Sequence, residues 1–163
     1  MRTQPFRGSH LPVLMKLMSM THGSVLELGC GIYSTIYLHW ACYPTCRRLV
    51  TYENNPKYFD FLKQFENRYH KTYCIEDYGS ADISEPWSIA FVDHAPDRQR
   101  VNEIKRLTQA EYVVAHDAEN ANNKKYKYPS IYSFFKYRWK FDERLPYTSI
   151  FSNHHDLSDF SIR

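Results

Sequence analysis

The chain alternates short runs of β-branched and aromatic residues with longer stretches in which apolar residues recur at helical spacing. The runs predict five strands in series, at residues 25–28, 48–53, 71–75, 88–92 and 111–115. Amphipathic helices are expected between them, at residues 34–41, 56–69 and 97–107. Strands that alternate with helices are typical of βαβ units. The sequence therefore predicts a doubly wound α/β fold with a mostly parallel sheet.

The C-terminal part of the chain departs from this alternation. Residues 119–128 are rich in Asn and Lys, and we expect them to form a long loop. A short helix is expected at residues 131–136, and the runs at 138–144 and 148–152 predict a closing antiparallel pair. With no internal repeat, residues 1–163 are expected to form a single domain.

The predicted helix at residues 56–69 opens with a proline, a residue favoured at the first helical position. Four of its apolar side chains share one helical face: Tyr58, Phe61, Leu62 and Phe65. We expect this face to belong to the core rather than to a ligand site.

Composition and charge limit the classes of protein that the chain can belong to. Hydrophobic residues make up 43% and aromatic residues 17% of its 163 residues, which excludes a disordered chain. The 21 basic and 18 acidic residues are mixed along the sequence and give a net charge of +3. This excess is too small to indicate a dedicated nucleic-acid binder, although nucleic acid stays open as a partner.

The cysteines and the N-terminal segment bear on location. The spacings of Cys30, Cys42, Cys46 and Cys74 form no C-x-x-C pair, so we expect reduced thiols rather than a zinc site. Pro12 interrupts the apolar run near the N-terminus, which argues against a signal peptide. No stretch is apolar and long enough to cross a bilayer, so we expect a cytoplasmic protein without a membrane partner.

Candidate chemistry gathers where the predicted strands end, which is where parallel α/β sheets bind ligands. After the first strand, Glu27 precedes the turn Gly29-Cys30-Gly31, whose glycines let the backbone approach a ligand closely. A dinucleotide fingerprint would need a third glycine where Ser34 stands. After the second strand comes Glu53, an acid placed to accept hydrogen bonds from ribose hydroxyls.

The segment 25–31 together with Glu53 resembles motif I and the following acidic residue of class I S-adenosylmethionine-dependent methyltransferases, a Rossmann-like family. The resemblance covers roughly residues 23–119 and implies an enzyme with S-adenosylmethionine as cofactor. It implies that Glu27 lies near the methionine amino group, that Glu53 holds the ribose and that the acidic loop after the third strand contacts the adenine. The implied cofactor contacts are Glu27, Gly29, Cys30, Gly31, Glu53, Asn54, Asp77, Tyr78 and Asp93.

Two further strand ends, residues 91–98 and 113–120, are similar to those of the catechol O-methyltransferase branch. That similarity implies a Mg²⁺ ion bound by Asp93 and Asp117. Two departures stand against it: Ala118 replaces the adjacent asparagine ligand, and residues 94–97 lack the lysine base of that branch. We therefore assign no metal ligands, and Mg²⁺ stays an alternative.

Methyl transfer from a sulfonium needs alignment, exclusion of water and, for some acceptors, a base. We expect Asp93, His94 and Asp117 at the catalytic end of the cleft. His94 or His116 could remove a proton from the acceptor, and each could equally be a structural imidazole. The chain contains neither a G-x-S-x-G elbow nor a P-loop, which argues against a serine hydrolase or a nucleotide phosphatase.

The segment after the fifth strand bears on the methyl acceptor. Residues 124–139 are basic and aromatic, and they could stack nucleic-acid bases, line a pocket for a small molecule or form core. We expect a methyltransferase acting on an oxygen or nitrogen of a small acceptor, and a homo-oligomer stays open. The alternatives are a catalytically silent cofactor-binding module acting through a partner, an enzyme that cleaves S-adenosylmethionine, and a nucleotide or nucleotide-sugar enzyme on the same fold.

Overall fold

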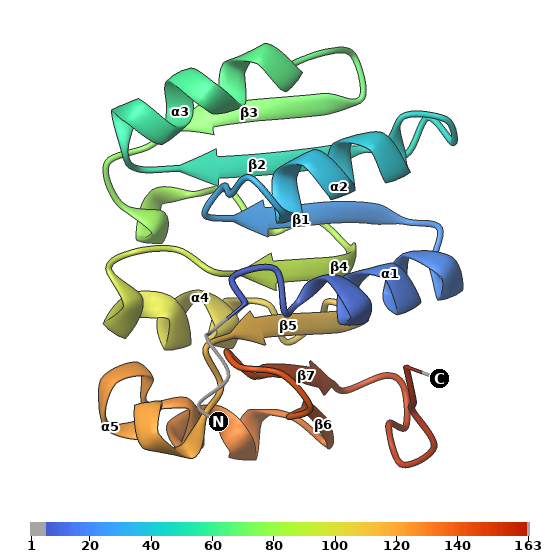
Figure 1. Cartoon of the computed structure of the whole chain (residues 1–163), viewed down its shortest axis with the longest axis vertical. Helices are drawn as coiled ribbons and strands as arrows, with labels where there is room; N and C mark the ends of the chain where they lie inside the picture. Colours follow the sequence, from blue (N-terminus) through green and yellow to red (C-terminus); the bar gives the residue numbers. More distant parts are fainter. Residues whose placement is uncertain (1–5, 163) are drawn as a thin grey trace.

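The computed structural model describes residues 6–162 and contains one seven-stranded sheet (Figure 1). The strand order is β3-β2-β1-β4-β5-β7-β6. Strands β1 to β5 are parallel, whereas β7 runs antiparallel to both β5 and β6. The strands are β1 (Ser24–Leu28), β2 (Leu49–Glu53), β3 (His70–Cys74), β4 (Trp87–Val92), β5 (Tyr112–His116), β6 (Tyr137–Phe141) and β7 (Thr148–Ser152). The predicted α/β fold with its closing antiparallel pair is confirmed.

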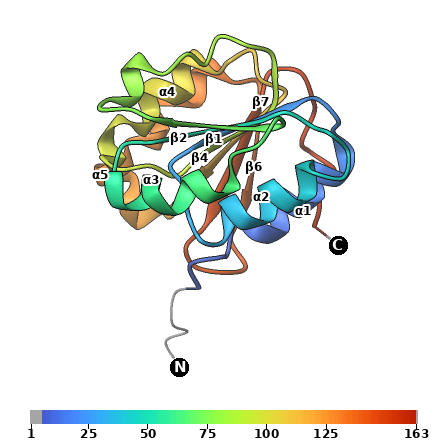
Figure 2. The ribbon, with the colours of Figure 1, turned by 90° about the horizontal axis from the view of Figure 1, so that it is seen from above.

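Helices cover both faces of this sheet, as Figure 2 shows. The helices are α1 (Leu11–Met20), α2 (Ser34–Cys42), α3 (Pro56–Leu62), α4 (Arg100–Arg106) and α5 (Asn123–Tyr126). The first three lie on one face, and α4 lies on the other. No helix within residues 6–162 has the length and apolar character that a bilayer span requires.

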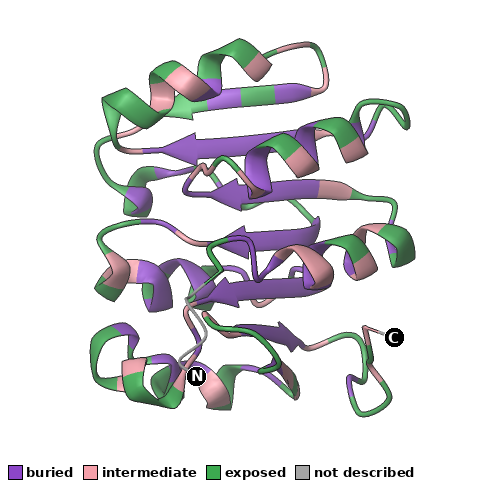
Figure 3. Ribbon diagram, in the orientation of Figure 1, coloured by how far each residue is buried: buried purple, intermediate pink, exposed green. Residues whose placement is uncertain are grey.

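The core consists of two apolar clusters, one on each face of the sheet. Every residue of β4 and β5 is buried, which fits strands covered on both sides (Figure 3). Side chains alternate between the clusters along β1, so Val25 packs towards α1 and α2 while Leu26 packs towards α4. The sheet therefore gives a rigid platform whose strand ends carry the site.

The strand order reverses between β1 and β4, and this reversal positions the site. Connections leave these two strands towards opposite sides, so the ends of β1, β2 and β4 border an opening at one edge of the sheet. Backbone hydrogen bonds continue just past the strands, from the Gly29 amide to the Tyr52 carbonyl and from the Asp93 amide to the Leu28 carbonyl. The turns that follow are thereby held in register.

The predicted helix at residues 56–69 is too long. Helix α3 ends at Leu62, and a 3₁₀ turn follows at Lys63–Phe65. The expectation that its aromatic face is core is also wrong: only Leu62 is buried, and Tyr58 is 56% exposed. The reason is tertiary, because α3 covers the edge of the sheet next to β3, where there is little apolar surface to bury.

The predicted loop at residues 119–128 is wrong as well. This segment forms a 3₁₀ turn at Asn120–Asn122 and helix α5, and a longer 3₁₀ helix follows at Tyr128–Phe134. Tyr126 and Tyr128 are buried with their rings stacked 5.5 Å apart, between centroids. Asn and Lys dominate the local composition, but these two tyrosines attach the segment to the core.

Helix α1 is the element that the hydrophobic pattern failed to predict. It follows the turn at residues 7–10 and has a proline in its first turn, where a missing N–H costs nothing. Its buried side chains Val13, Leu14 and Leu17 pack on the same face as α2. The N-terminal apolar run is therefore a core helix.

Candidate functional site

A cleft of about 690 Å³ opens at the carboxyl ends of β1, β2 and β4. Six of the residues predicted as site residues border it: Gly29, Cys30, Glu53, Asn54, Asp93 and His94. Five residues that were not predicted as site residues complete the lining: Asn55, Pro56, Tyr58, Ala95 and Pro96. A concave opening at the reversal of strand order is the usual ligand site of this architecture.

Gly29 makes the closest backbone approach within the cleft. Its φ of 92° lies in the left-handed region, and a Cβ built on it would stand 2.6 Å from the Cα of His94. Any side chain here would both strain the backbone and collide with the loop after β4. Gly31 is different, since its Cβ would meet only Ser34 Oγ, at an ordinary 3.5 Å. Only the first glycine of the turn is required by geometry.

Glu53 ties two of the cleft's turns together through its carboxylate. Its Oε2 accepts from the Cys30 amide at 2.9 Å, and its Oε1 accepts from the amides of Asn54 at 3.0 Å and Asn55 at 2.7 Å. A carboxylate has about four acceptor positions, so one remains for a ligand hydroxyl. The orientation of Glu53 is thus fixed before any ligand binds.

Glu27 lies beneath the glycine turn and does not border the cleft. Its side chain is fully buried and accepts hydrogen bonds from the hydroxyls of Thr35 and Thr51, each at 2.9 Å. The Thr35 hydroxyl also accepts from the Gly31 amide at 3.0 Å, so Glu27 supports the turn through one intermediary. Burial raises the pKa of Glu27 to about 7, because water is excluded from its charged form.

Asp93 and Asp117 share one buried cation, the guanidinium of Arg100 from α4. The ion pairs measure 2.9 Å from Arg100 to Asp93 Oδ1 and 3.1 Å to Asp117 Oδ2. Burial alone would lower the pKa of Arg100, but the charges of Asp93 and Asp117 and the contact with Tyr128 together outweigh it and raise the pKa. Arg100 also donates to the carbonyls of His94 and His116. One side chain therefore fixes the ends of both β4 and β5.

The two histidines expected as bases are both buried. The His94 imidazole is stacked on Tyr78, with centroids 3.8 Å apart, and its Nε2 pairs with Glu103 at 3.1 Å. His116 Nδ1 lies 3.1 Å from Asp93 Oδ2. Burial would lower the pKa of His116, but its hydrogen bond to Asp93 and the negative charges of Asp93 and Asp117 together raise it above the ordinary value. His94 borders the cleft, but its imidazole ring is buried against Tyr78. His116 is connected to the cleft by its hydrogen bond to Asp93.

The predicted adenine neighbours are not in the cleft lining. Tyr78 is fully buried and its hydroxyl donates to the Tyr52 carbonyl at 3.4 Å, so its ring belongs to the core. Asp77 is exposed at the start of a 3₁₀ turn. Neither side chain joins the residues that the cleft brings together.

The donor set at Asp93 and Asp117 does not fit a Mg²⁺ ion. Mg²⁺ requires near-octahedral oxygen ligands, yet a guanidinium lies between the two carboxylates. Tyr126 takes a further position by donating to Asp117 Oδ2 at 3.0 Å. Arg100 had no signal in the sequence, since an arginine in an amphipathic helix is ordinarily expected at the surface.

Comparison with solved structures decides the fold. Cofactor-bound Rv0187 from MTB aligns with a TM-score of 0.69 at 16% identity, over 95% of this chain and 84% of that one. The chain has the same fold as solved O-methyltransferases. No family model and no curated protein matches the sequence.

Other solved proteins with the class I methyltransferase fold carry the cofactor or its product. The O-methyltransferase TomG from Streptomyces achromogenes, in complex with SAM, aligns with a TM-score of 0.64 at 16% identity, over 90% of this chain and 79% of that one. An O-methyltransferase from Bacillus cereus, in complex with SAH, aligns at 0.61 and 14% identity, over 91% and 80%. At sequence identities this low, the similarity to these structures shows a shared fold and nothing further.

Proposed function

We propose that the chain is an S-adenosylmethionine-dependent methyltransferase that acts on an oxygen or nitrogen of a small acceptor. The observation that carries the proposal is the pairing, in one cleft, of the Gly29 turn with the immobilised carboxylate of Glu53. Fold neighbours crystallised with SAM and SAH add support. The competing nucleotide-sugar and silent-module hypotheses have no observation in their favour.

In this proposal the remaining acceptor position of Glu53 takes a hydrogen bond from a ribose hydroxyl. Both oxygens of the Glu53 carboxylate already accept hydrogen bonds from backbone amides, so ligand binding loses little side-chain entropy. Gly29 lets the turn after β1 pack against the loop after β4, because a Cβ there would collide with the His94 backbone, and both segments border the cleft in which the ligand would lie. Cys30 and Asn54 complete the contacts on either side.

S-adenosylmethionine supplies an electrophilic methyl group when bound. The protein must align the acceptor with it and exclude water. Asp93 borders the cleft at the end of β4, and Arg100 holds its carboxylate in place. We assign Asp93 to orienting the cationic centre, with Asp117 supporting Arg100 from the other side. His94 positions the loop after β4 through its contact with Tyr78.

A small acceptor fits the dimensions of the cleft, since sites of a few hundred Å³ ordinarily hold small molecules. The cysteines within residues 6–162 are all unpaired thiols. Unpaired thiols are ordinary in reducing compartments, and we place the protein in the cytoplasm on that basis.

The direct test is isothermal titration with S-adenosylhomocysteine, with NAD and UDP-glucose as specificity controls. We expect the first to bind and the other two to give no heat. In Glu53→Ala we expect affinity to fall by about 1 to 3 kcal/mol, because the charge-assisted hydrogen bond to the ribose is lost.

Glu85→Ala is the matched control, because Glu85 is an exposed acid that pairs with Arg48 before β4, away from the cleft. Its affinity should equal that of the wild type. Circular dichroism of both variants separates a lost contact from a lost fold. Equal affinities in wild type and Glu53→Ala would refute the ribose assignment, and silence of the wild type would refute the cofactor.

A further inference from the structure

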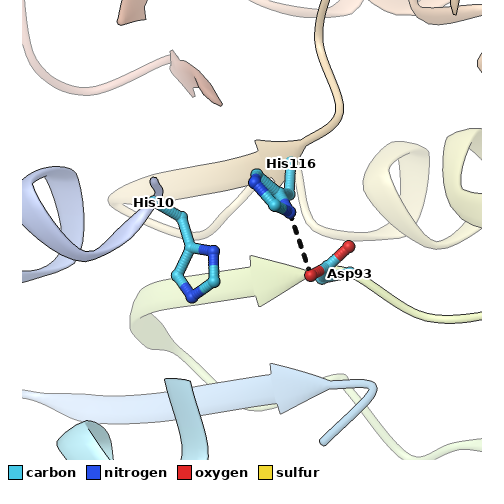
Figure 4. Close-up of side chains that lie close together, drawn as sticks. All are labelled: His10, Asp93 and His116. Carbon is cyan, nitrogen blue, oxygen red and sulfur yellow. Dashed lines mark hydrogen bonds and ion pairs between the residues drawn. The ribbon is translucent and has the colours of Figure 1, made fainter. Parts of the chain in front are cut away.

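Three side chains from distant parts of the chain meet beside the cleft: His10, Asp93 and His116 (Figure 4). They come from the start of α1, the end of β4 and the end of β5. One ligand atom from each lies within 4.8 Å of the other two. Two imidazoles and a carboxylate at such distances form a recurrent metal-binding set.

His10 is the most unusual member of this cluster. It is 3% exposed, and neither of its ring nitrogens has a hydrogen-bond partner within residues 6–162. Its ring is packed against His116, with centroids 4.7 Å apart, and against Phe91 at 4.9 Å. A buried polar group without a partner costs about 1 to 3 kcal/mol, and native structures nearly always satisfy such groups. Coordination through one nitrogen would remove that cost.

The hydrogen bonds of His116 point the same way. The Ser9 hydroxyl donates its one proton to the Pro146 carbonyl, so at 3.1 Å it can only accept from His116 Nε2. A neutral His116 with its proton on Nε2 then directs the Nδ1 lone pair at Asp93 Oδ2, 3.1 Å away. Two acceptors that face each other require a positive charge between them, either a proton or a metal ion.

We propose that His10, Asp93 and His116 bind a divalent first-row transition-metal ion of the Zn²⁺ class. Imidazole ligands favour such ions over Mg²⁺, which prefers oxygen. Three protein ligands leave at least one coordination position for water or a solute. This site differs from the rejected Mg²⁺ arrangement because it replaces Asp117 with two imidazoles.

The charges around the cluster accommodate a divalent ion. Asp93 and Asp117 carry two negative charges and Arg100 one positive charge, which leaves one net negative charge before the ion binds. Asp93 also borders the cleft, so an ion has a route from solvent. Arg100 contacts Oδ1 of Asp93, and Oδ2 faces His116.

The test uses chelator-treated full-length protein from which any affinity tag has been removed. Titration with Co²⁺ is followed by visible absorbance, and Zn²⁺ is then added to displace it. We expect one equivalent per chain and a raised Tm in the metal-bound protein. His10→Ala should weaken Co²⁺ binding by at least about tenfold. His22→Ala, which changes an exposed histidine just after α1, should bind as the wild type does.

X-ray absorption of the Zn²⁺-loaded wild type supplies a readout that needs no variant, in case His10→Ala fails to fold. Two imidazole ligands with light oxygen neighbours are expected. Absence of stoichiometric binding would overturn the proposal and leave a proton or a water in the site. Binding that survives in His10→Ala, or a zinc shell containing sulfur, would overturn it too. Titration with S-adenosylhomocysteine in chelator reports separately on the cofactor site.

Discussion

Glu27 gives the sharpest test of the electrostatics beneath the cleft. Its side chain is fully buried at the end of β1, and its pKa rises from an ordinary 4.5 to about 7 because burial disfavours the charge. The folded state thus binds this proton more tightly than the unfolded state. The stability carried by protonated Glu27 is present below about pH 4.5 and is lost as the pH rises through about 7.

Glu27→Gln replaces the carboxylate by a neutral group of the same shape. The difference between the two pKa values corresponds to about 3 kcal/mol of unfolding free energy at a pH above both. We expect the variant to be more stable than the wild type by up to about 3 kcal/mol near pH 8, and equally stable near pH 4. The amide can keep both contacts, since the hydroxyls of Thr35 and Thr51 can each donate or accept.

Urea unfolding at these two pH values measures the effect, with Glu85→Gln as the exposed control. The control should change stability by no more than about 0.5 kcal/mol at either pH. A wild-type-to-variant difference that is the same at both pH values would refute the reasoning. It would mean that Glu27 keeps one protonation state in the fold throughout this range.

Gly29→Ala should lower the unfolding free energy by at least about 2 kcal/mol, because Gly29 has a positive φ and a Cβ there would clash with His94. Gly31→Ala, where a Cβ has room, should change it little, and urea unfolding measures both variants. Equal losses in the two variants would contradict this account of the turn. Arg100→Met should lower the unfolding free energy by about 3 to 5 kcal/mol, since two partly buried carboxylates lose their shared guanidinium partner. Thermal unfolding measures this, with the exposed Arg98→Met as the control. A loss of stability no larger than that of the control would show that Arg100 does not stabilise the ends of β4 and β5.

Local pattern was enough to determine the sheet. The strands are short runs rich in β-branched, aromatic or other apolar residues, and all seven were predicted to within a few residues. The turn at Gly29 and the acid at Glu53 follow such strands directly. Their convergence in one cleft then follows from parallel topology, so this half of the site was predictable.

The wrong predictions concern segments whose conformation and burial depend on contacts with residues distant in sequence. The composition of residues 119–128 predicts a loop, but Tyr126 packs against Arg100, whose guanidinium lies 4.9 Å from the ring centroid. This contact orders the segment. Tyr58 has the spacing of a core residue, but the edge position of α3 leaves it at the cleft. Period alone cannot reveal which surface a helix finds beneath it.

The charged end of the cleft was decided by tertiary structure alone. Arg100 reaches Asp93 and Asp117 from the first turn of α4, and His10 comes from the start of α1. No spacing rule links these residues, because their contacts depend on how separate elements pack. Local sequence determines the backbone conformation and the hydrophobic period of each element. The partners of buried charges and imidazoles are determined by how the helices pack on the sheet.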